Sequence, residues 1–388
     1  MQNSSRIDVA DALRGFSVLG IVLLHSIEHF NFYSFPEVTS EWFKFWDTAI
    51  WDSLFFAFGG KAYGIFALLF GFSFFIQDNN QLKKGNNFRP RFLWRLFLLF
   101  IWGNINAIFF TGEILVLYSL VGITLLLVAR LPNKAILIIA ILFLLQPLEW
   151  IKLINALLHP ELSAPKSMAS FYFKEAFKIQ GSGNFIETAK MNLWEGQLAS
   201  LTWAWENGRI FQTSAYFMLG MLLGRTQLFI NTPQNIRFWS KILAIAIICF
   251  FPLKGLTDML PSFIENRAIL KPSILIVGSL AKFAFMCFII ALFIIAYYQS
   301  KSHNLLSKLI PYGKMSLTCY ITQSIIGSFI FYNWGLGLHD KLSITYSFLV
   351  GIGIFFVQYL FAYWWFKSHK HGPLEYIWKK ATWIGAKS

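Results

Sequence analysis

Arg14 and His25 are the ionisable residues of the first long apolar segment, and they lie eleven positions apart with nothing ionisable between them. On a helix this spacing is about three turns plus ~20°, so the two side chains share one face, roughly 16 Å apart along the axis. An arginine fork suits a phosphate or a carboxylate, and a histidine suits general-base catalysis or transient acyl transfer. Ionisable groups inside a membrane usually serve a site or a partner. The alternative is structural: Arg14 reaches lipid headgroups and His25 bonds a neighbouring helix.

Further polar residues interrupt the later apolar runs. Lys61 and Tyr63 follow two glycines, and Lys61 either anchors a helix at the interface or holds an anionic group. Asn106 lies within a run and therefore needs a hydrogen-bond partner. Glu113 opens the next run, where it serves either the helix dipole or a site. Gln323 lies in a late run with Ser, Thr and Tyr, either as a packing contact or as cavity lining.

The segment His25-Ser-Ile-Glu28-His29 has the residue order of one class of zinc peptidases, with both histidines on one helical face. No third ligand follows in a matching context, and a pattern of this length arises by chance. We therefore expect no metal site here.

The elements that must position these residues are membrane helices. The chain has 388 residues, of which 56% are hydrophobic and only 13% charged, and a soluble protein of this size needs more surface charge. Its net charge of +14 comes from short basic clusters between apolar runs. This distribution argues against nucleic-acid binding and is typical of cytoplasmic membrane loops. The composition predicts an all-α, polytopic transmembrane bundle.

Apolar runs long enough to cross a bilayer predict about ten spans in a single transmembrane domain over 1–388. The runs are 12–30, 58–77, 92–110, 113–131, 134–151, 209–225, 238–256, 273–298, 315–333 and 343–366. The segment 42–57 is short, aromatic and interrupted by two aspartates, so we expect an interfacial or re-entrant piece there.

The basic clusters all fall on one side of these spans if both termini are cytoplasmic. They lie near 83–95, 130–134, 225–241, 301–314 and 367–380. The opposite side holds the stretch 152–208, an expected extracytoplasmic loop that carries several glutamates and tryptophans. It could cap a cavity, bind a sugar or form an amphipathic lid on the lipid surface.

Several short motifs follow one another through nearly the whole chain. They are Asp11-x-x-Arg14-Gly-Phe, Gly60-Lys61 with Leu-Leu-Phe70-Gly71, Gly112-Glu113-Ile-Leu with Tyr118, Met-Leu-Gly220-Met-Leu-Leu-Gly224-Arg225, Met315-Ser-Leu-Thr318-x-Tyr320 with Gln323-Ser324, and Gly372-Pro373-Leu-Glu375-x-x-Trp378. Each is weak alone, but the ordered set resembles the YeiB-like family of bacterial integral membrane proteins of unknown function. That family is similar to a superfamily of membrane acyltransferases, which includes the acyltransferase-3 proteins and the heparan-glucosaminide acetyltransferase.

The resemblance implies that an acyl group moves from cytoplasmic acyl-CoA, with acetyl-CoA the expected donor, to an extracytoplasmic glycan or lipid-linked acceptor. The YeiB-like pattern has Asn in place of His25 and His in place of Asn106. The swap makes sense if spans one and three face each other, and it also reproduces the Arg and His spacing of the acyltransferase-3 family. It could equally mean lost or altered activity.

On this hypothesis, Arg14 and Arg95 meet the CoA phosphates, His25 is the base or acyl relay, and Asn106 orients it. The residues expected to bind the acceptor are Lys61, Tyr63, Glu113 and Gln323. The expected partners are the lipid bilayer and a small-molecule or glycan acceptor, with a homodimer left open, and the expected location is the bacterial plasma membrane. A transporter or exporter could use the same polar residues without covalent chemistry, and paired broken helices in two repeated halves would favour it. A non-catalytic scaffold is favoured if those residues face different directions.

Overall fold

The computed structural model describes residues 7–161 and 163–385, which form helices and connecting turns with no strand among them. In chain order the elements are α1 (Asp8–Ile27), α2 (Glu41–Phe58), α3 (Ala62–Leu82), α4 (Arg89–Ala107), α5 (Leu115–Val121), α6 (Ile123–Val128), α7 (Asn133–Leu144), α8 (Pro147–Leu158), α9 (Met168–Ser182), α10 (Phe185–Met191), the π-helix η1 (Asn192–Gly196), α11 (Gln197–Glu206), α12 (Arg209–Arg225), α13 (Pro233–Phe263), α14 (Arg267–Tyr297), α15 (Ser300–Leu306), the 3₁₀ turn η2 (Ser307–Leu309), α16 (Ile310–Lys314), α17 (Ser316–Phe331), α18 (Ile344–Trp365) and α19 (Pro373–Thr382).

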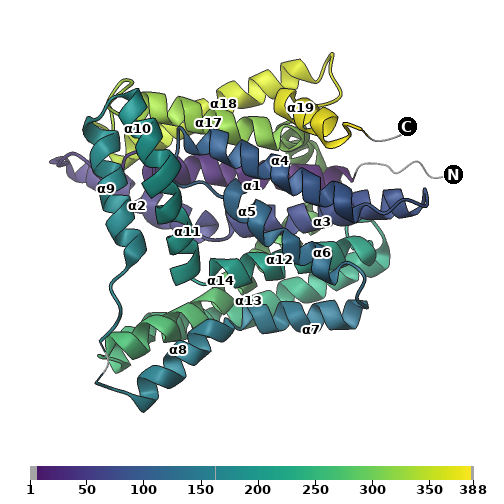
Figure 1. The fold of residues 1–388 in the computed structure, drawn as a ribbon, viewed down its shortest axis with the longest axis horizontal. Coiled ribbons are helices and arrows are strands. Elements are labelled where there is room, and N and C mark those ends of the chain that lie inside the picture. The colour runs from purple at the N-terminus through teal and green to yellow at the C-terminus, as the bar shows by residue number, and fades with distance from the viewer. Residues whose placement is uncertain (1–6, 162, 386–388) are drawn as a thin grey trace.

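The long helices run back and forth between two ends of a bundle (Figure 1). The first and last described residues of the chain both lie on one side of the bundle, which we call the terminal end. We call the opposite side of the bundle the far end. Hydrogen bonds join distant segments at each end. At the terminal end, Arg225 Nη2 donates to the Ala129 carbonyl at 2.6 Å. At the far end, the Thr345 amide donates to Asp47 Oδ1 at 2.7 Å.

Five helical stretches of the described chain are long and apolar enough to cross a membrane, and the bent pair α7–α8 makes a sixth if it is one span. The five are Asp8–Ile27, Glu41–Leu82, Pro233–Phe263, Arg267–Tyr297 and Ile344–Trp365. The other expected spans also coincide with helices, namely α4, α5 with α6, α12 and α17, but these are shorter or more polar. The described chain is therefore that of an all-helical membrane protein, in which five to six helical stretches meet this criterion.

α12 shows why a helix of the bundle can be short and polar. Most of its residues are buried inside the protein, including Gln212 and Thr213, so its faces meet other helices more than lipid. It also touches α3 backbone to backbone, because a β-carbon on Gly220 would lie 1.7 Å from the Leu68 carbonyl oxygen. On α3, a β-carbon on Gly71 would lie 1.9 Å from the Phe217 carbonyl oxygen. Small residues at such crossings allow helices in membranes to pack closely.

The main hydrophobic core surrounds this crossing. Aromatic side chains from several helices interlock there, and they include Phe70, Phe74, Phe92, Tyr118 and Phe217. The core therefore holds α3, α4, α5 and α12 in fixed positions around the polar residues described below.

A break between α7 and α8 helps to position the start of α12. Gln146 has a left-handed backbone with φ +58°, and Pro147 follows it, so the two helices meet at a bend of 42°. The Gln146 side chain lies against Gly208, where a β-carbon would be 2.2 Å from Gln146 Oε1. Gly208 itself has φ +64°, and α12 begins with the next residue, Arg209.

Two segments that the sequence predicts to lie outside the regular spans are largely helical. Residues 42–57 form most of α2, which packs beside α1 and α18 and makes one apolar stretch of 42 residues with α3. The stretch 152–208 is mostly helical, since it contains α9, α10, η1 and α11, which gather at the far end (Figure 1). Glu206 ties the end of α11 to the start of α9, because its carboxylate accepts hydrogen bonds from Ser167 Oγ at 2.6 Å and from the Met168 amide at 2.8 Å.

Candidate functional site

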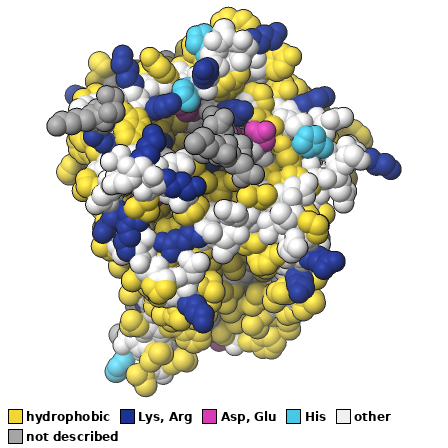
Figure 2. Space-filling view, turned by 90° about the vertical axis from the view of Figure 1, so that its right-hand side faces the viewer, with side chains coloured by type: hydrophobic (Ala, Val, Ile, Leu, Met, Phe, Trp, Pro, Cys, Tyr) yellow, Lys and Arg dark blue, Asp and Glu magenta, His cyan; other side chains and the backbone are white. Residues whose placement is uncertain are grey.

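A cavity of about 870 Å³ opens at the terminal end and reaches into the bundle. Its wall carries five cationic side chains, which are Arg14, Lys83, Arg95, Lys314 and Lys379. Figure 2 looks on to this end of the molecule and shows Lys and Arg side chains spread over it, with few acidic ones among them. The cavity is thus suited to a ligand with several negative charges.

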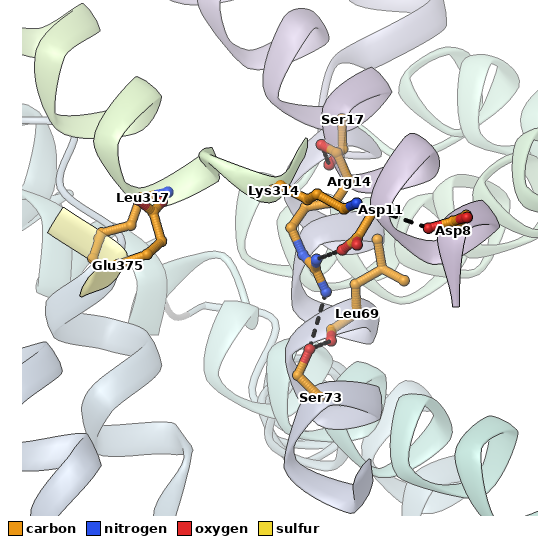
Figure 3. A network of polar contacts seen from close by, with 9 residues as sticks. All are labelled: Asp8, Asp11, Arg14, Ser17, Leu69, Ser73, Lys314, Leu317 and Glu375. Atoms are coloured by element: carbon orange, nitrogen blue, oxygen red, sulfur yellow. Dashed lines mark hydrogen bonds and ion pairs between the residues drawn. The ribbon is translucent and has the colours of Figure 1, made fainter. Parts of the chain in front are cut away.

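Arg14 is held in the cavity wall by two neighbours on different helices (Figure 3). Its Nη1 donates to Asp11 Oδ1 at 2.5 Å, one turn earlier on α1, and its Nη2 donates to Ser73 Oγ on α3 at 3.0 Å. Ser73 in turn donates to the Leu69 carbonyl at 2.8 Å. The guanidinium therefore has a fixed orientation at the point where α1 and α3 meet.

Arg95 also lines the cavity, on α4, where it meets the C-terminal helix. Its guanidinium stacks on the ring of Trp378 at 3.6 Å, and its Nη1 donates to Thr382 Oγ1 at 3.5 Å. Arg91 Nη1 donates to the Thr382 carbonyl at 3.1 Å, and Trp94 Nε1 donates to a second carbonyl of α19 at 3.0 Å. The amphipathic helix α19 is therefore fastened to α4 as a side wall of the cavity.

Glu375 fixes the other side of α19. Its carboxylate accepts hydrogen bonds from the Leu317 and Thr318 amides at 2.7 and 3.1 Å, at the first turn of α17, and from Thr318 Oγ1 at 2.6 Å. A carboxylate at this position satisfies amides that the helix leaves unpaired. Burial nevertheless raises the pKa of the Glu375 carboxyl, because desolvation outweighs these hydrogen bonds. The position of α19 is thus set by α4, from the first third of the chain, and by α17, which lies shortly before it.

His25 lies beyond the inner end of the cavity. Tyr118 and Tyr320 are among the innermost lining residues, and the ring centroids of Tyr320 and His25 are 6.4 Å apart. The His25 ring also packs on Phe110 at 4.7 Å, and its Nδ1 is buried with no hydrogen-bond partner in the described structure. His25 itself does not line the cavity, so Tyr320 stands between them.

Asn106 and Glu113 form a buried pair at the C-terminal end of α4. Asn106 Nδ2 donates to the Glu113 carboxylate, which also accepts a hydrogen bond from the Leu115 amide. Asn106 Oδ1 has no partner among the described residues. The structure gives no hydrogen bond between Asn106 and His25, so the expected orienting contact is not seen.

Gln323 faces the same buried region as His25. It lies three positions after Tyr320 and four before Gly327, so the three residues share one face of α17. Tyr320 meets the His25 ring, and Gly327 lies against Phe30, which itself packs on His25 at 6.0 Å. Both amide atoms of Gln323 and the Tyr320 hydroxyl are buried without partners in the described part of the chain. Because buried polar groups are normally hydrogen-bonded, this concentration indicates a place for water or a ligand.

Lys61 and Tyr63 belong to a different cluster, nearer the far end. Lys61 Nζ donates to the carbonyls that end α2, and the Tyr63 hydroxyl accepts a hydrogen bond from Arg209 Nη1 at 2.6 Å. Lys282 of α14 approaches the same place. Sequence reasoning missed Arg209 and Lys282, although an isolated lysine within the long apolar run 273–298 is the signal that could have revealed Lys282.

No group of three or more His, Cys, Asp or Glu side chains that could hold a metal ion occurs among residues 7–161 and 163–385. In the segment with the zinc-peptidase order, His29 Nε2 instead lies 3.4 Å from the carboxylate of Glu28.

The fold and the cavity define a helical, multi-span membrane protein with a cavity lined by cationic side chains at one end. Residues 223–385 match the family described as "Protein of unknown function (DUF418)". The chain is 27% identical to the uncharacterized protein YxaH of Bacillus subtilis, over 98% of this chain and 95% of that protein. It is 24% identical to an uncharacterized 39.9 kDa protein of Bacillus acidopullulyticus, over 97% and 94%.

A shorter match connects the chain to the uncharacterized protein YeiB of Escherichia coli, with 32% identity over 18% of each chain. No solved structure matches. These matches confirm the resemblance to the YeiB-like family of unknown function that the ordered motifs predict.

Proposed function

We propose that this protein is a transmembrane acyltransferase that moves an acyl group from acyl-CoA, entering at the terminal end, to a glycan or lipid-linked acceptor on the other side. The observation that carries the proposal is the cationic cavity, whose inner end meets Tyr320 next to His25. Such a reaction needs two parts. One is a donor site that opens to one side of the membrane, and the other is a buried histidine beyond it.

The cavity suits the phosphates of CoA in charge and in size. Arg14 and Arg95 both line it, and three lysines line the same space. Its volume of about 870 Å³ lies in the range of roughly 300–1,000 Å³ that is typical of ligand pockets. Arginine forks bind phosphate oxygens in a planar, bidentate way, which favours a polyphosphate over an uncharged ligand.

Each of these residues has a separate role in the proposed reaction. Acyl-CoA supplies an activated acyl group when it is bound. Arg14 and Arg95 hold the phosphates. His25 takes the proton of an acceptor hydroxyl as its oxygen bonds to the acyl carbon and the carbon–sulfur bond breaks, and it passes that proton to the CoA thiolate that leaves. In the alternative, His25 itself takes the acyl group, with release of CoA as the thiol, and then passes the group to the acceptor hydroxyl. Gln323 and Tyr320 offer unpartnered polar atoms beside His25 that would orient the reacting groups. Asn106 and Glu113 form the adjoining polar pair on the acceptor side, with Lys61 and Tyr63 further out.

The proposal includes a topology of ten spans in a bacterial plasma membrane, with both termini in the cytoplasm. Its support is the alternating direction of the helices and the gathering of basic side chains at the terminal end (Figures 1 and 2). Basic residues are enriched in cytoplasmic loops, so this end would face the pool of acyl-CoA.

The test is incubation of the purified full chain in detergent with radiolabelled acetyl-CoA, with CoA release and label transfer as readouts. His25→Ala and Arg14→Ala should each reduce turnover by at least about a hundredfold, the usual contribution of a positioned acid–base group. The matched controls are His159→Ala and Arg237→Ala, because both residues are exposed and neither lines the cavity. Turnover that survives in His25→Ala would remove this residue from the mechanism. Folded protein that neither binds nor cleaves acetyl-CoA would favour a transporter or exporter.

A further inference from the structure

Three cations meet outside the cavity, around the far ends of α3 and α12. Lys61 directly precedes α3, Arg209 is the first residue of α12, and Lys282 lies near the middle of α14. A β-carbon on Gly60 would be 3.3 Å from both Arg209 Nη2 and Lys282 Cδ. Gly60 also has φ +73°, a conformation that glycine adopts at little cost. Three positive side chains therefore converge around one glycine.

No ion pair joins Lys61, Arg209 or Lys282 to a carboxylate of the described chain. Lys61 Nζ donates instead to two backbone carbonyls, at 2.6 and 3.1 Å. Arg209 Nη1 donates to the Tyr63 hydroxyl at 2.6 Å and to Gln212 Oε1 at 2.8 Å, and both partners are neutral. The charges of the three cations also act on one another electrostatically.

The nearby carboxylates have other partners. Glu206 lies three positions before Arg209 but accepts hydrogen bonds from the start of α9. Glu28 is within electrostatic range of Arg209, yet its oxygens lie 3.4 Å from the Tyr33 hydroxyl and 3.4 Å from His29 Nε2. The cluster therefore keeps a positive charge that the described protein does not neutralise.

Donors remain for a ligand. Arg209 is only 8% exposed, and its Nε is buried without a partner in the described structure. Lys282 is exposed, with no hydrogen-bond partner among the described residues. Leaving buried donors unpaired and like charges together is unfavourable, and an oxyanion between them removes both costs. The N-termini of α3 and α12 favour negative charge at the same place.

The depth of the cluster matches that of lipid headgroups. The 17 residues of α12 span about 26 Å, close to the roughly 30 Å thickness of the hydrocarbon layer. Arg225, at the other end of α12, bonds the exposed loop after α6 at the terminal end. Arg209 therefore lies near the opposite boundary of the membrane, where the headgroups of the far leaflet are expected.

An apolar surface continues from the cations towards the lipid. The rings of Phe56, Phe285 and Phe250 pack together, with centroids 4.7 and 4.8 Å apart in succession, and Phe56 is 50% exposed. Lys61 Nζ lies over the rings of Phe56 and Phe285, at 5.8 and 5.3 Å from their centroids. A ligand at this place would have a charged head among cations and an apolar part along aromatic rings.

We propose that Lys61, Arg209 and Lys282 bind the phosphate group of an anionic amphiphile, whose apolar chain lies along Phe56 and Phe285. Arg209 and Lys282 are the principal donors to the phosphate oxygens, and Lys61 adds charge. The site stands on the cation cluster and does not require acyl transfer. It deepens the proposed function by giving a lipid-linked acceptor a phosphate-binding position on the far side.

The test is calorimetric titration of the detergent-purified full chain with short-chain phosphatidic acid. Diacylglycerol of the same chain length tests the apolar part alone, and inorganic phosphate tests the anion alone. The double variant R209Q/K282Q should weaken phosphatidic acid binding roughly tenfold or more, the loss expected for a charge-assisted contact. Lys271→Gln is the control, since it removes one positive charge from an exposed position of α14 outside the cluster.

Each arm decides between specific outcomes. Displacement of phosphatidic acid by inorganic phosphate would support recognition of the anion. Equal affinity for phosphatidic acid and for inorganic phosphate would show that free phosphate is the ligand. Equal binding of diacylglycerol, or unchanged binding of phosphatidic acid by the double variant, would overturn the proposal. Lys282→Arg keeps the charge and should keep the affinity, which separates loss of binding from loss of fold. Because the assay contains no acyl-CoA, its result is independent of the acyl-transfer test.

Discussion

At the scale of single residues, His25 is surrounded by polar groups that the described protein leaves without hydrogen bonds. They are the Tyr320 hydroxyl, on a ring 6.4 Å from that of His25, and both amide atoms of Gln323 on the same face of α17, and the His25 Nδ1 is itself without a partner in the described structure. Each such group costs about 1–3 kcal/mol when it is buried and unpaired. A cluster of them beside one histidine is a disadvantage for stability alone, and it is useful where a ligand or water must be bound.

Replacing Gln323 with leucine should therefore separate stability from activity. The variant removes two unpaired polar atoms at similar volume, so the thermal unfolding temperature should stay the same or rise. Acyl transfer should fall about tenfold if the amide orients the reacting groups. The matched control is Gln358→Leu on α18, where the amide bonds Tyr312, Cys319 and Thr322. That variant should lose about 1–3 kcal/mol of stability. A comparable loss in Gln323→Leu would show that its amide has partners.

At the scale of elements, the contact of α3 with α12 sets the distance between the cavity and the cation cluster. Ser73 of α3 holds Arg14, and Arg209 at the start of α12 holds Tyr63, just inside the start of α3. The two helices can approach this closely only because glycines face backbone atoms at their crossing.

Gly220→Val should destabilise the protein by about 3 kcal/mol, because a β-carbon there meets the Leu68 carbonyl and only a shift of a whole helix can relieve the overlap. Gly353→Ala is the control, since its β-carbon would enter open space within α18. That control should be neutral or gain up to about 1 kcal/mol. Thermal unfolding in detergent, followed by circular dichroism, measures both. A Gly220→Val protein as stable as the wild type would contradict the observed helix crossing.

The helices at the far end are joined by a carboxylate that responds to pH. Burial would raise the pKa of Glu206, but hydrogen bonds from Ser167, Met168 and Ala169 outweigh it and hold the pKa below its ordinary value. A lowered carboxyl pKa adds stability that is complete above the ordinary value of 4.5 and is lost as the pH falls below it.

We therefore expect the contact of α9 with α11 to loosen in acid. Hydrogen exchange at the Met168 and Ala169 amides, corrected for the intrinsic pH dependence of exchange, should lose protection below about pH 4.5. Glu206→Gln should show reduced protection at neutral pH and little further change in acid. Glu187→Gln, in the neighbouring α10, is the control that keeps the Glu206 contact. Protection that is independent of pH in the wild type would contradict this account.

At the scale of the whole molecule, the charges are distributed unevenly between the two ends. The connections at the terminal end carry clusters of Lys and Arg, whereas the helices α9–α11 at the far end carry most of the glutamates of the stretch 152–208. Such an asymmetry orients a membrane protein with its basic side in the cytoplasm.

Cysteine labelling in whole cells tests this orientation. In a background without native cysteines, Ser182→Cys at the end of α9 should react with a membrane-impermeant maleimide added outside. Lys370→Cys, in the turn before α19, should react only after the membrane is opened. Both positions are accessible, since Lys370 and Ser182 are both exposed. The reverse labelling pattern would place the cavity outside and remove acyl-CoA as its ligand.

The sequence by itself determined the membrane class, the helical architecture and the resemblance to the YeiB-like family. All ten predicted apolar runs coincide with helices, and Arg14 and Arg95, predicted to meet the same phosphates, line one cavity. These features follow from local composition, because transfer of a segment into lipid depends on its own residues.

Only the tertiary structure decided which side chains meet. It joined Asn106 to Glu113, placed α19 on Arg95, and grouped Lys61 with Arg209 and Lys282. These contacts connect segments from distant parts of the chain, and they depend on how closely the helix backbones approach and which faces they turn to each other. The apolar pattern along the chain carries little of that information, because in a membrane neither lipid nor protein distinguishes one apolar face from another.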